Sequence, residues 1–207
     1  GYEACLRAEE ENYRDGNCGA GCGATVGKFA GMDCCMKSGI GSYALQIGEL
    51  LVGAVVAVNA LGDIYDWKSG RKLAGLLAED RRSFRGTEEL MYADTRAVDN
   101  KFTGNTTIGV IITNAAFQKP SLCKIAGMAH DGYARSIRPV HTTADGDSIY
   151  AVSVGNADGS RVCADQDLVG ALAAEVMSEA ITVAVKSARS AYGYPAWKDL
   201  IVLPASI

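Results

Sequence analysis

Residues 104–115 read Gly104-Asn105-Thr106-Thr107-Ile108-Gly109-Val110-Ile111-Ile112-Thr113-Asn114-Ala115, a run in which two adjacent threonines open a β-branched segment. Since β-branched residues fit the pleated surface of a sheet, this composition predicts a strand from Thr106 to Thr113. A threonine pair at the start of a strand usually has only this structural role. The flanking sequence decides whether Thr106 also has a chemical role.

Further strands and helices are expected on both sides of this strand. Upstream, Ile40 to Ile47 and Leu50 to Asn59 have the composition of strands, and the second is almost continuously apolar, as in a central strand. Downstream, Ser148 to Val154 is predicted as a strand, and Pro120 to Arg138 and Asp165 to Ser190 as long amphipathic helices. Strands with helices laid over them indicate a layered α/β architecture on an antiparallel or mixed sheet.

Three other segments have weaker patterns. Gly1 to Asn12 has helical spacing, and Gly16 to Lys28 is so dense in glycine that it predicts a tight turn entering a closely packed strand. The glycine spacing does not give G-x-G-x-x-G and no βαβ unit follows, which counts against dinucleotide binding. Asp66 to Asn100 is charged and lacks a sustained period, so we expect an exposed connection with room for a short helix.

Composition excludes several function classes. The 207 residues are 48% hydrophobic and 21% charged, enough to bury a sizeable core in one large domain or part of one. A net charge of −4 leaves no basic face for nucleic acid. The longest apolar run, Leu50 to Leu61, is too short to span a bilayer. Gly1 to Asn12 lacks the basic start and apolar stretch of a secretory signal, so we expect a cytoplasmic protein without a membrane partner.

The cysteines and histidines give no strong site. Seven cysteines at irregular spacings suit neither a disulfide framework nor a simple metal site. A zinc site formed by Cys18, Cys22, Cys34 and Cys35 would lack both a CxxC motif and a nearby histidine, so we expect reduced thiols. The two histidines are His130, which we interpret as a packed or capping residue of its helix, and His141, in a loop. GxSxG, P-loop and HExxH motifs are absent from the sequence.

Several ordered motifs together resemble the DmpA/P1 aminopeptidase family, also called peptidase family S58. In this family the precursor cuts itself immediately before a serine or threonine, and residues 104–115 resemble that processing site. The other matching segments are Ala129 to Arg135, Ile137 to Pro139, Asp145 to Tyr150, Gly16 to Gly21 and the strand that bears Lys28. The resemblance therefore covers nearly the whole chain.

The resemblance implies a fold and an organisation. The family fold is an α-β-β-α sandwich, shared with the ornithine acetyltransferases. Family precursors begin with a long segment before the part that matches Gly1, so we expect this chain to be N-terminally truncated. Residues 1–105 would then be the C-terminal part of the α segment, and residues 106–207 the β segment that begins at the nucleophile, together forming one domain. Family members assemble from processed halves, which implies a homo-oligomer.

The chemistry implied at Thr106 follows from the weakness of a threonine hydroxyl as a nucleophile. Cleavage between Asn105 and Thr106 would create a base, because a free α-amine ordinarily has a pKa of about 7.7 to 8.0. The hydroxyl would attack the carbonyl of Asn105, pass through an ester, and later attack the amide of a small peptide or other small amide. The expected function is an autoprocessing aminopeptidase or oligoamide hydrolase that needs no metal or organic cofactor.

Four further positions match catalytic residues of the family. Lys28 matches a lysine that lowers an amine pKa or supports the oxyanion, the alternative being a solvated lysine at a strand end. Asn59 matches the asparagine that donates to the oxyanion, the alternative being a residue that begins a turn. Asp145 and Asp147 could hydrogen-bond the nucleophile and its ammonium, or simply form an Asp-Gly-Asp turn.

The sequence leaves open both the branch of the family and the function. Two aspartates at positions 145 and 147, and a threonine after an asparagine, resemble the branch containing the nylon-oligomer hydrolase more than the L-aminopeptidase/D-esterase members. An ornithine acetyltransferase-like acyl transferase is the enzymatic alternative, since that group shares the fold and the processing at threonine. A catalytically inactive fragment with an interaction or structural role is the other alternative.

Overall fold

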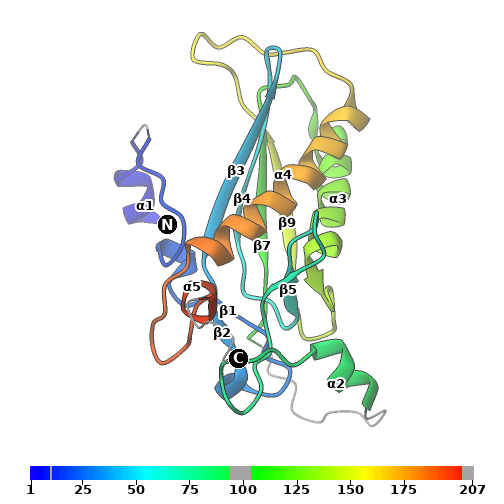
Figure 1. Cartoon of the computed structure of the whole chain (residues 1–207). Helices are drawn as coiled ribbons and strands as arrows, with labels where there is room; N and C mark the ends of the chain where they lie inside the picture. Colours follow the sequence, from blue (N-terminus) through cyan, green and yellow to red (C-terminus); the bar gives the residue numbers. More distant parts are fainter. Residues whose placement is uncertain (10, 94–103, 202–207) are drawn as a thin grey trace.

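The structure, a computed structural model, describes residues 1–9, 11–93 and 104–201 (Figure 1). The helices are α1 (Tyr2–Leu6), α2 (Thr87–Ala93), α3 (Lys119–Ser136), α4 (Gln166–Ser187) and α5 (Trp197–Ile201), with short 3-10 turns at Gly19–Gly21 and Met32–Cys34. The strands are β1 (Thr25–Val26), β2 (Met36–Lys37), β3 (Ile40–Ile47), β4 (Leu50–Ala57), β5 (Asp63–Tyr65), β6 (Lys72–Ala74), β7 (Ile108–Thr113), β8 (Ile137–Arg138) and β9 (Ser148–Ser153).

The main sheet has four strands in the order β3-β4-β7-β9. Strand β4 pairs antiparallel with both β3 and β7, whereas β7 pairs in parallel with β9, so the sheet is mixed as expected. Val110 of β7 lies opposite Val55 on one side and Tyr150 on the other. The parallel pair is joined through α3, as a parallel connection requires a crossover. Strand β7 begins at Ile108 and not at the expected Thr106, so Thr106 lies just before an inner strand of the sheet.

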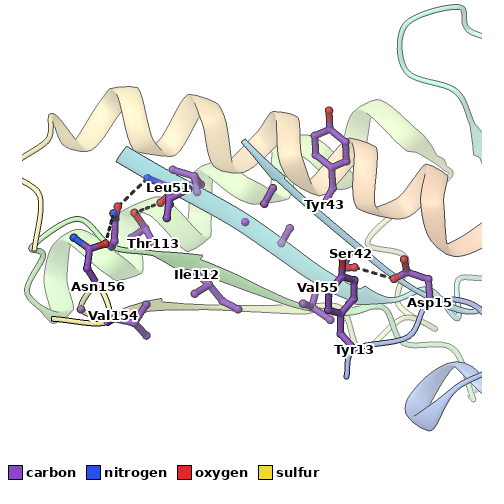
Figure 2. Close-up of a pocket in the computed structure, with 17 residues that line it drawn as sticks. Tyr13, Asp15, Ser42, Tyr43, Leu51, Val55, Ile112, Thr113, Val154 and Asn156 are labelled. Atoms are coloured by element: carbon purple, nitrogen blue, oxygen red, sulfur yellow. Dashed lines mark hydrogen bonds between the residues drawn. The ribbon is translucent and has the colours of Figure 1, made fainter. Parts of the chain in front are cut away.

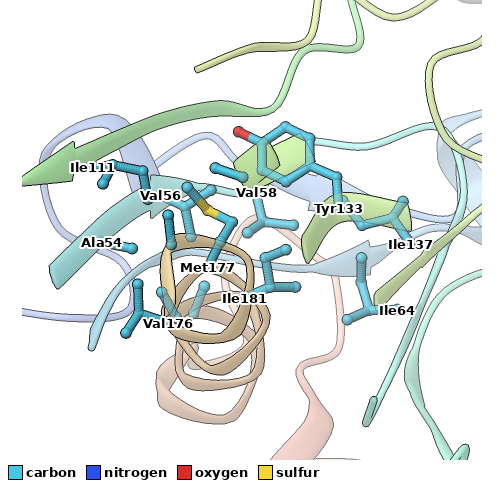
Figure 3. Close-up of a cluster of buried hydrophobic side chains, with 14 of the residues drawn as sticks. Ala54, Val56, Val58, Ile64, Ile111, Tyr133, Ile137, Val176, Met177 and Ile181 are labelled. Atoms are coloured by element: carbon cyan, nitrogen blue, oxygen red, sulfur yellow. The ribbon is translucent and has the colours of Figure 1, made fainter. Parts of the chain in front are cut away.

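Helices α3 and α4 pack on one face of this sheet. Ala54 and Val56 of β4, and Val58 just after the strand, point toward Val176 and Met177 of α4, as Figure 3 shows. Helix α4 is long and apolar enough by length and composition to cross a membrane, but 72% of that window is buried within the fold, as for a core helix. Leu168, in the first turn of α4, is 45% exposed.

The opposite face of the main sheet is open in the described part of the chain. Leu51, Ile112 and Val152 are large apolar residues on this face, and each is at least 37% exposed. Figure 2 shows a pocket over this face, lined by Leu51, Val55 and Ile112 together with Tyr13 from the N-terminal segment. The described residues thus form one helical layer on one main sheet, which confirms the layered α/β class.

The expectation for Asp66 to Asn100 is wrong in its middle part. Strand β6 pairs with β5, and Leu73, Leu76 and Leu77 are at most 1% exposed. This short apolar run packs into the core beside β5. Because charged residues flank it, the average composition of the segment does not indicate a buried run. Helix α2 is the short helix that was expected, while residues 94–100 lie outside the described residues.

Candidate active site

The Asn105–Thr106 peptide lies between the end of β4 and the turn that precedes β9. The Thr106 N–H donates to the carbonyl oxygen of Asn59 at 3.0 Å, and the Gly146 N–H donates to the carbonyl oxygen of Asn105 at 3.0 Å. Asn105 also forms an isolated parallel bridge with Asp145 and is 1% exposed. Main-chain hydrogen bonds therefore hold the two residues of this peptide bond from opposite sides.

The two adjacent threonine hydroxyls have different surroundings. The Thr106 hydroxyl donates to the carbonyl oxygen of Asn105, the residue immediately before it. The Thr107 hydroxyl is buried and has no hydrogen-bond partner among the described residues. A Cβ atom at Gly146 would lie 2.8 Å from the Thr106 hydroxyl oxygen, so this position leaves room for the hydroxyl only as glycine. Of the two threonines, Thr106 is the one whose hydroxyl lies against the preceding carbonyl.

Lys28 and Asn59 form a hydrogen-bonded pair beside this peptide. The Lys28 ammonium donates to Asn59 Oδ1 at 2.8 Å and to the Asn59 carbonyl oxygen at 3.1 Å. The Thr25 N–H also donates to Asn59 Oδ1, which leaves the Asn59 Nδ2 group to donate to the carbonyl oxygen of Gly104 at 2.8 Å. The two donors on Oδ1 fix the orientation of the amide. Asn59 thus bonds residues distant in sequence rather than a local turn.

Burial changes the protonation of Lys28. Its side chain is 1% exposed, so the alternative of a solvated lysine is wrong. Burial is the main cause that lowers the pKa of Lys28 to about 8, against the opposing influence of Cys35 and Asp145. Burial likewise raises the pKa of the Cys35 thiol to about 11, so this neighbour stays neutral near pH 7. The pair therefore contains an amine that changes its charge close to neutral pH.

Both aspartates lie at the site, Asp145 through its main-chain bridge with Asn105 and Asp147 through its bond to the residue after Thr106. Asp145 Oδ1 accepts from the Leu61 N–H at 3.2 Å, and its Oδ2 accepts from the Thr142 hydroxyl at 2.6 Å. Asp147 Oδ1 accepts from the Thr107 N–H at 2.8 Å, and its side chain is only 4% exposed. The structure thus brings Lys28, Asn59, Asp145 and Asp147 around Thr106. Their catalytic roles stay predictions.

Sequence reasoning missed three neighbours of these residues. Gly146 donates to the Asn105 carbonyl, His141 Nδ1 lies 2.9 Å from Asp147 Oδ2, and the Tyr133 hydroxyl donates to the Thr107 carbonyl at 3.3 Å. Burial raises the pKa of Tyr133, so its hydroxyl stays protonated and acts as a donor. His130 is half-buried against Tyr133 as a packed residue, yet it also contacts His141. The sequence offered one signal: Tyr133 and Gly146 lie within the matching segments, whereas His141 lies between two of them.

The described residues contain no group of three or more His, Cys, Asp or Glu side chains that could hold a metal ion. All seven cysteines are free thiols, including Cys18, Cys22, Cys34 and Cys35 of the zinc hypothesis. Within this part of the chain, the groups that surround Thr106 are an amine, an amide, two carboxylates and main-chain N–H groups. Such groups suit acyl transfer to a hydroxyl.

Sequence comparisons give the same family as the motifs. The sequence model of peptidase family S58 matches residues 1–197. An uncharacterized aminopeptidase of Mycobacterium leprae is 32% identical over 209 residues, which is 95% of this chain and 55% of the relative. A 6-aminohexanoate-oligomer endohydrolase of Kocuria sp. is 31% identical over 185 residues, which is 84% of this chain and 51% of the relative. The chain thus spans about half the length of these relatives.

Solved structures share the fold. An L-aminopeptidase D-Ala-esterase/amidase of Ochrobactrum anthropi, described as a variant of the Ntn hydrolase fold, superposes with a TM-score of 0.59 at 19% identity, covering 90% of this chain and 48% of that one. A β-aminopeptidase of Burkholderia sp. also has a TM-score of 0.59, at 20% identity, covering 97% of this chain and 56% of that one. At these identities the likeness concerns the fold alone.

Proposed function

The chain belongs to peptidase family S58, and from this premise we propose that Thr106 cuts the Asn105–Thr106 bond and then hydrolyses small amides as an N-terminal nucleophile. One observation carries the proposal: the Thr106 hydroxyl and the Gly146 N–H both donate to the carbonyl oxygen of Asn105. A hydroxyl beside a carbonyl whose oxygen already has a donor is arranged for attack on that carbonyl.

In the self-cleavage step, Thr106 Oγ forms a bond to the carbonyl carbon of Asn105. The Gly146 N–H supports the negative charge that develops on the carbonyl oxygen. The C–N bond then breaks, the hydroxyl proton is delivered to the leaving nitrogen, and an ester joins Asn105 to Thr106. Water hydrolyses this ester, which yields a carboxylate at Asn105 and a free amine at Thr106.

In the hydrolytic step, the freed amine takes the proton of the Thr106 hydroxyl as the hydroxyl attacks a substrate amide. The carbonyl of Asn59, which accepts from the Thr106 nitrogen at 3.0 Å, holds this amine in place. Cleavage also frees the Gly104 carbonyl to move away from Asn59 Nδ2, which then donates to the oxyanion of the substrate. The nearby Lys28 ammonium lowers the pKa of the new amine by charge repulsion and keeps the Asn59 amide oriented.

The two processed halves are proposed to stay together. Strand β4 belongs to residues 1–105 and β7 to residues 106–207, and the two pair in register over six residues from Val52↔Thr113 to Ala57↔Ile108. Cleavage between Asn105 and Thr106, before β7 begins, leaves these hydrogen bonds in place. We propose further association of processed subunits into a homo-oligomer, for which the open apolar sheet face offers surface.

Intact-mass analysis of the purified chain tests the proposal. We expect the wild type to give two fragments split after Asn105 that co-elute in gel filtration, and Thr106→Ala to stay whole. Thr107→Ala is the matched control and should still be cut, because its hydroxyl does not contact the Asn105 carbonyl. A wild type that stays whole on long incubation, or cleavage in Thr106→Ala, would contradict the self-cleavage.

The substrate class is tested on the processed protein with two kinds of amide. Because relatives named aminopeptidase and 6-aminohexanoate-oligomer endohydrolase match at similar identity, we use amino-acid p-nitroanilides and a linear 6-aminohexanoate dimer. The threonine after an asparagine, Asn105-Thr106, and the two aspartates favour the oligoamide. Transfer of an acyl group to added ornithine, faster than release to water, would instead favour the acyl transferase.

A further inference from the structure

A chain of polar contacts leads from the main chain at Thr107 to a pair of histidines. The Thr107 N–H donates to Asp147 Oδ1 at 2.8 Å, and Asp147 Oδ2 lies 2.9 Å from His141 Nδ1. His141 Nε2 lies 3.2 Å from His130 Nδ1 in helix α3. The Tyr133 ring packs against both histidines, with centroid distances of 5.3 Å and 5.9 Å. This chain of contacts thus joins the segment before β7, the loop before β9 and helix α3.

The contacts restrict where protons can be. An ionised Asp147 only accepts, so His141 Nδ1 must carry a proton. His141 Nε2 then accepts from His130 Nδ1 when both rings are neutral. One added proton preserves every contact, because it goes to the outer nitrogen of His130, and the single proton between the rings then lies on either His130 Nδ1 or His141 Nε2. A second added proton puts N–H groups on both sides of the 3.2 Å contact, which must then open.

We propose that His130 and His141 share protons as a pair that positions Asp147 and sets the lower pH limit of the active site. The inference rests on the proposed function, because Asp147 holds the residue next to Thr106. His141 acts as a positioning residue: its side chain is 39% exposed and exchanges protons with solvent, whereas that of Asp147 is 4% exposed. Through the histidine pair, the pH of the solvent therefore acts on the buried carboxylate of Asp147.

The groups around the pair agree with this arrangement. In helix α3 the groups that act on His130 are Asp131 and the packed Tyr133, and in the loop before β9 they are His141 and Asp147. Burial is the largest cause that lowers the pKa of His130, and the charge of His141 is the next. The two aspartates oppose both causes. Burial and the charge of His141 thus both disfavour the protonated form of His130.

The first test measures the histidines directly, in Thr106→Ala so that the chain stays whole. The chain has two histidines, so a single replacement assigns both imidazole spectra in an NMR pH titration. We expect His141 to carry its proton on Nδ1 at pH 8, and His130 to titrate at higher pH in His141→Asn than in the parent. Independent titrations, or a His141 tautomer protonated only on Nε2, would overturn the proposal whether or not the protein is an enzyme.

The second test follows the rate of self-cleavage against pH in His141→Asn and His141→Leu. Asparagine places an N–H near the position of Nδ1 without titrating, so it should restore most of the rate at pH 8 and remove the fall on the acid side. Leucine removes the donor and should slow the reaction on the order of tenfold to a hundredfold, as expected for a misplaced group. Profiles parallel to that of the wild type in both variants would mean that His141 only packs. Loss of Thr106-dependent cleavage in the wild type would instead contradict the proposed function.

Discussion

The two sides of the Asn105–Thr106 bond differ in charge and in access to solvent. On one side Lys28 is a buried cation whose ammonium donates to both oxygens of Asn59. On the other side Asp147 is a carboxylate joined to the half-exposed His141. The cationic side presents groups to carbonyl oxygens, and the anionic side holds main-chain N–H groups. We propose that the cationic side acts on charge that develops in the reaction, and that the anionic side positions the nucleophile and, through the Gly146 N–H, supports the Asn105 carbonyl oxygen.

The largest expected effect comes from removing the donor on the cationic side. Asn59→Asp keeps an oxygen for Lys28 and Thr25 but replaces the Nδ2 donor with an acceptor. We expect hydrolysis of added substrate to fall by about a hundredfold to a thousandfold, as when an oxyanion donor is lost. Self-cleavage should fall less, because the Asn105 carbonyl keeps the Gly146 N–H. Rates of both reactions in one preparation measure this difference.

A matched control separates this effect from general damage. Asn114→Asp makes the same chemical change at a buried asparagine on the far end of β7, where Nδ2 donates to the Glu49 carbonyl at 2.8 Å. It should lower the melting temperature and leave the rate per folded molecule unchanged. Equal losses of self-cleavage and hydrolysis in Asn59→Asp would mean that both steps share one donor.

The next effect concerns the anionic side. Gly146→Ala would place a Cβ 2.8 Å from the Thr106 hydroxyl oxygen, so the hydroxyl or the turn must shift. We expect self-cleavage to slow on the order of a hundredfold from this misplacement. Gly127→Ala is the control, because a Cβ at that helical position meets no atom within 4 Å. An unchanged rate in Gly146→Ala, measured by intact mass over time, would contradict the assigned position of the hydroxyl.

The comparison also predicts a pH profile for hydrolysis. The rate should rise as the Thr106 amine loses its proton, at a pH below the ordinary α-amine pKa of about 7.7 to 8.0, because the Lys28 ammonium lowers the pKa of this amine. It should fall again as Lys28, with a pKa lowered to about 8, loses its charge at higher pH. Lys28→Arg keeps the charge at all accessible pH values, so the falling limb should disappear even if the maximal rate drops. A falling limb that persists in Lys28→Arg would assign it to another group.

Local patterns predicted the fold better than the site. Strand β3 has the expected bounds, Ile40–Ile47, and α3 begins one residue before the expected Pro120, because periodicity and helix-start signals are local. The positions around Thr106 came from ordered motifs, and the structure brings them together. The partners of Asp147 could not be read from the sequence, because the contact with His141 depends on how the loop after β8 folds back toward the turn. The buried Leu76 was missed because the apolar run around it is short and lies between charged residues.

The smallest effect tests whether the two sides are coupled. The negative charge of Asp145 raises the pKa of Lys28 against the larger effect of burial, although its hydrogen bonds go to Leu61 and Thr142. Asp145→Asn removes that charge and keeps a similar shape, so the pKa of Lys28 should fall further. The falling limb of the hydrolysis profile then moves to lower pH, while the rising limb stays in place. Because Thr142→Val disturbs the same turn without changing charge, it should leave the limb where it is. A limb that moves equally in both variants would show that Asp145 acts through the turn and not through its charge, and that the cationic side is electrostatically independent of the anionic one.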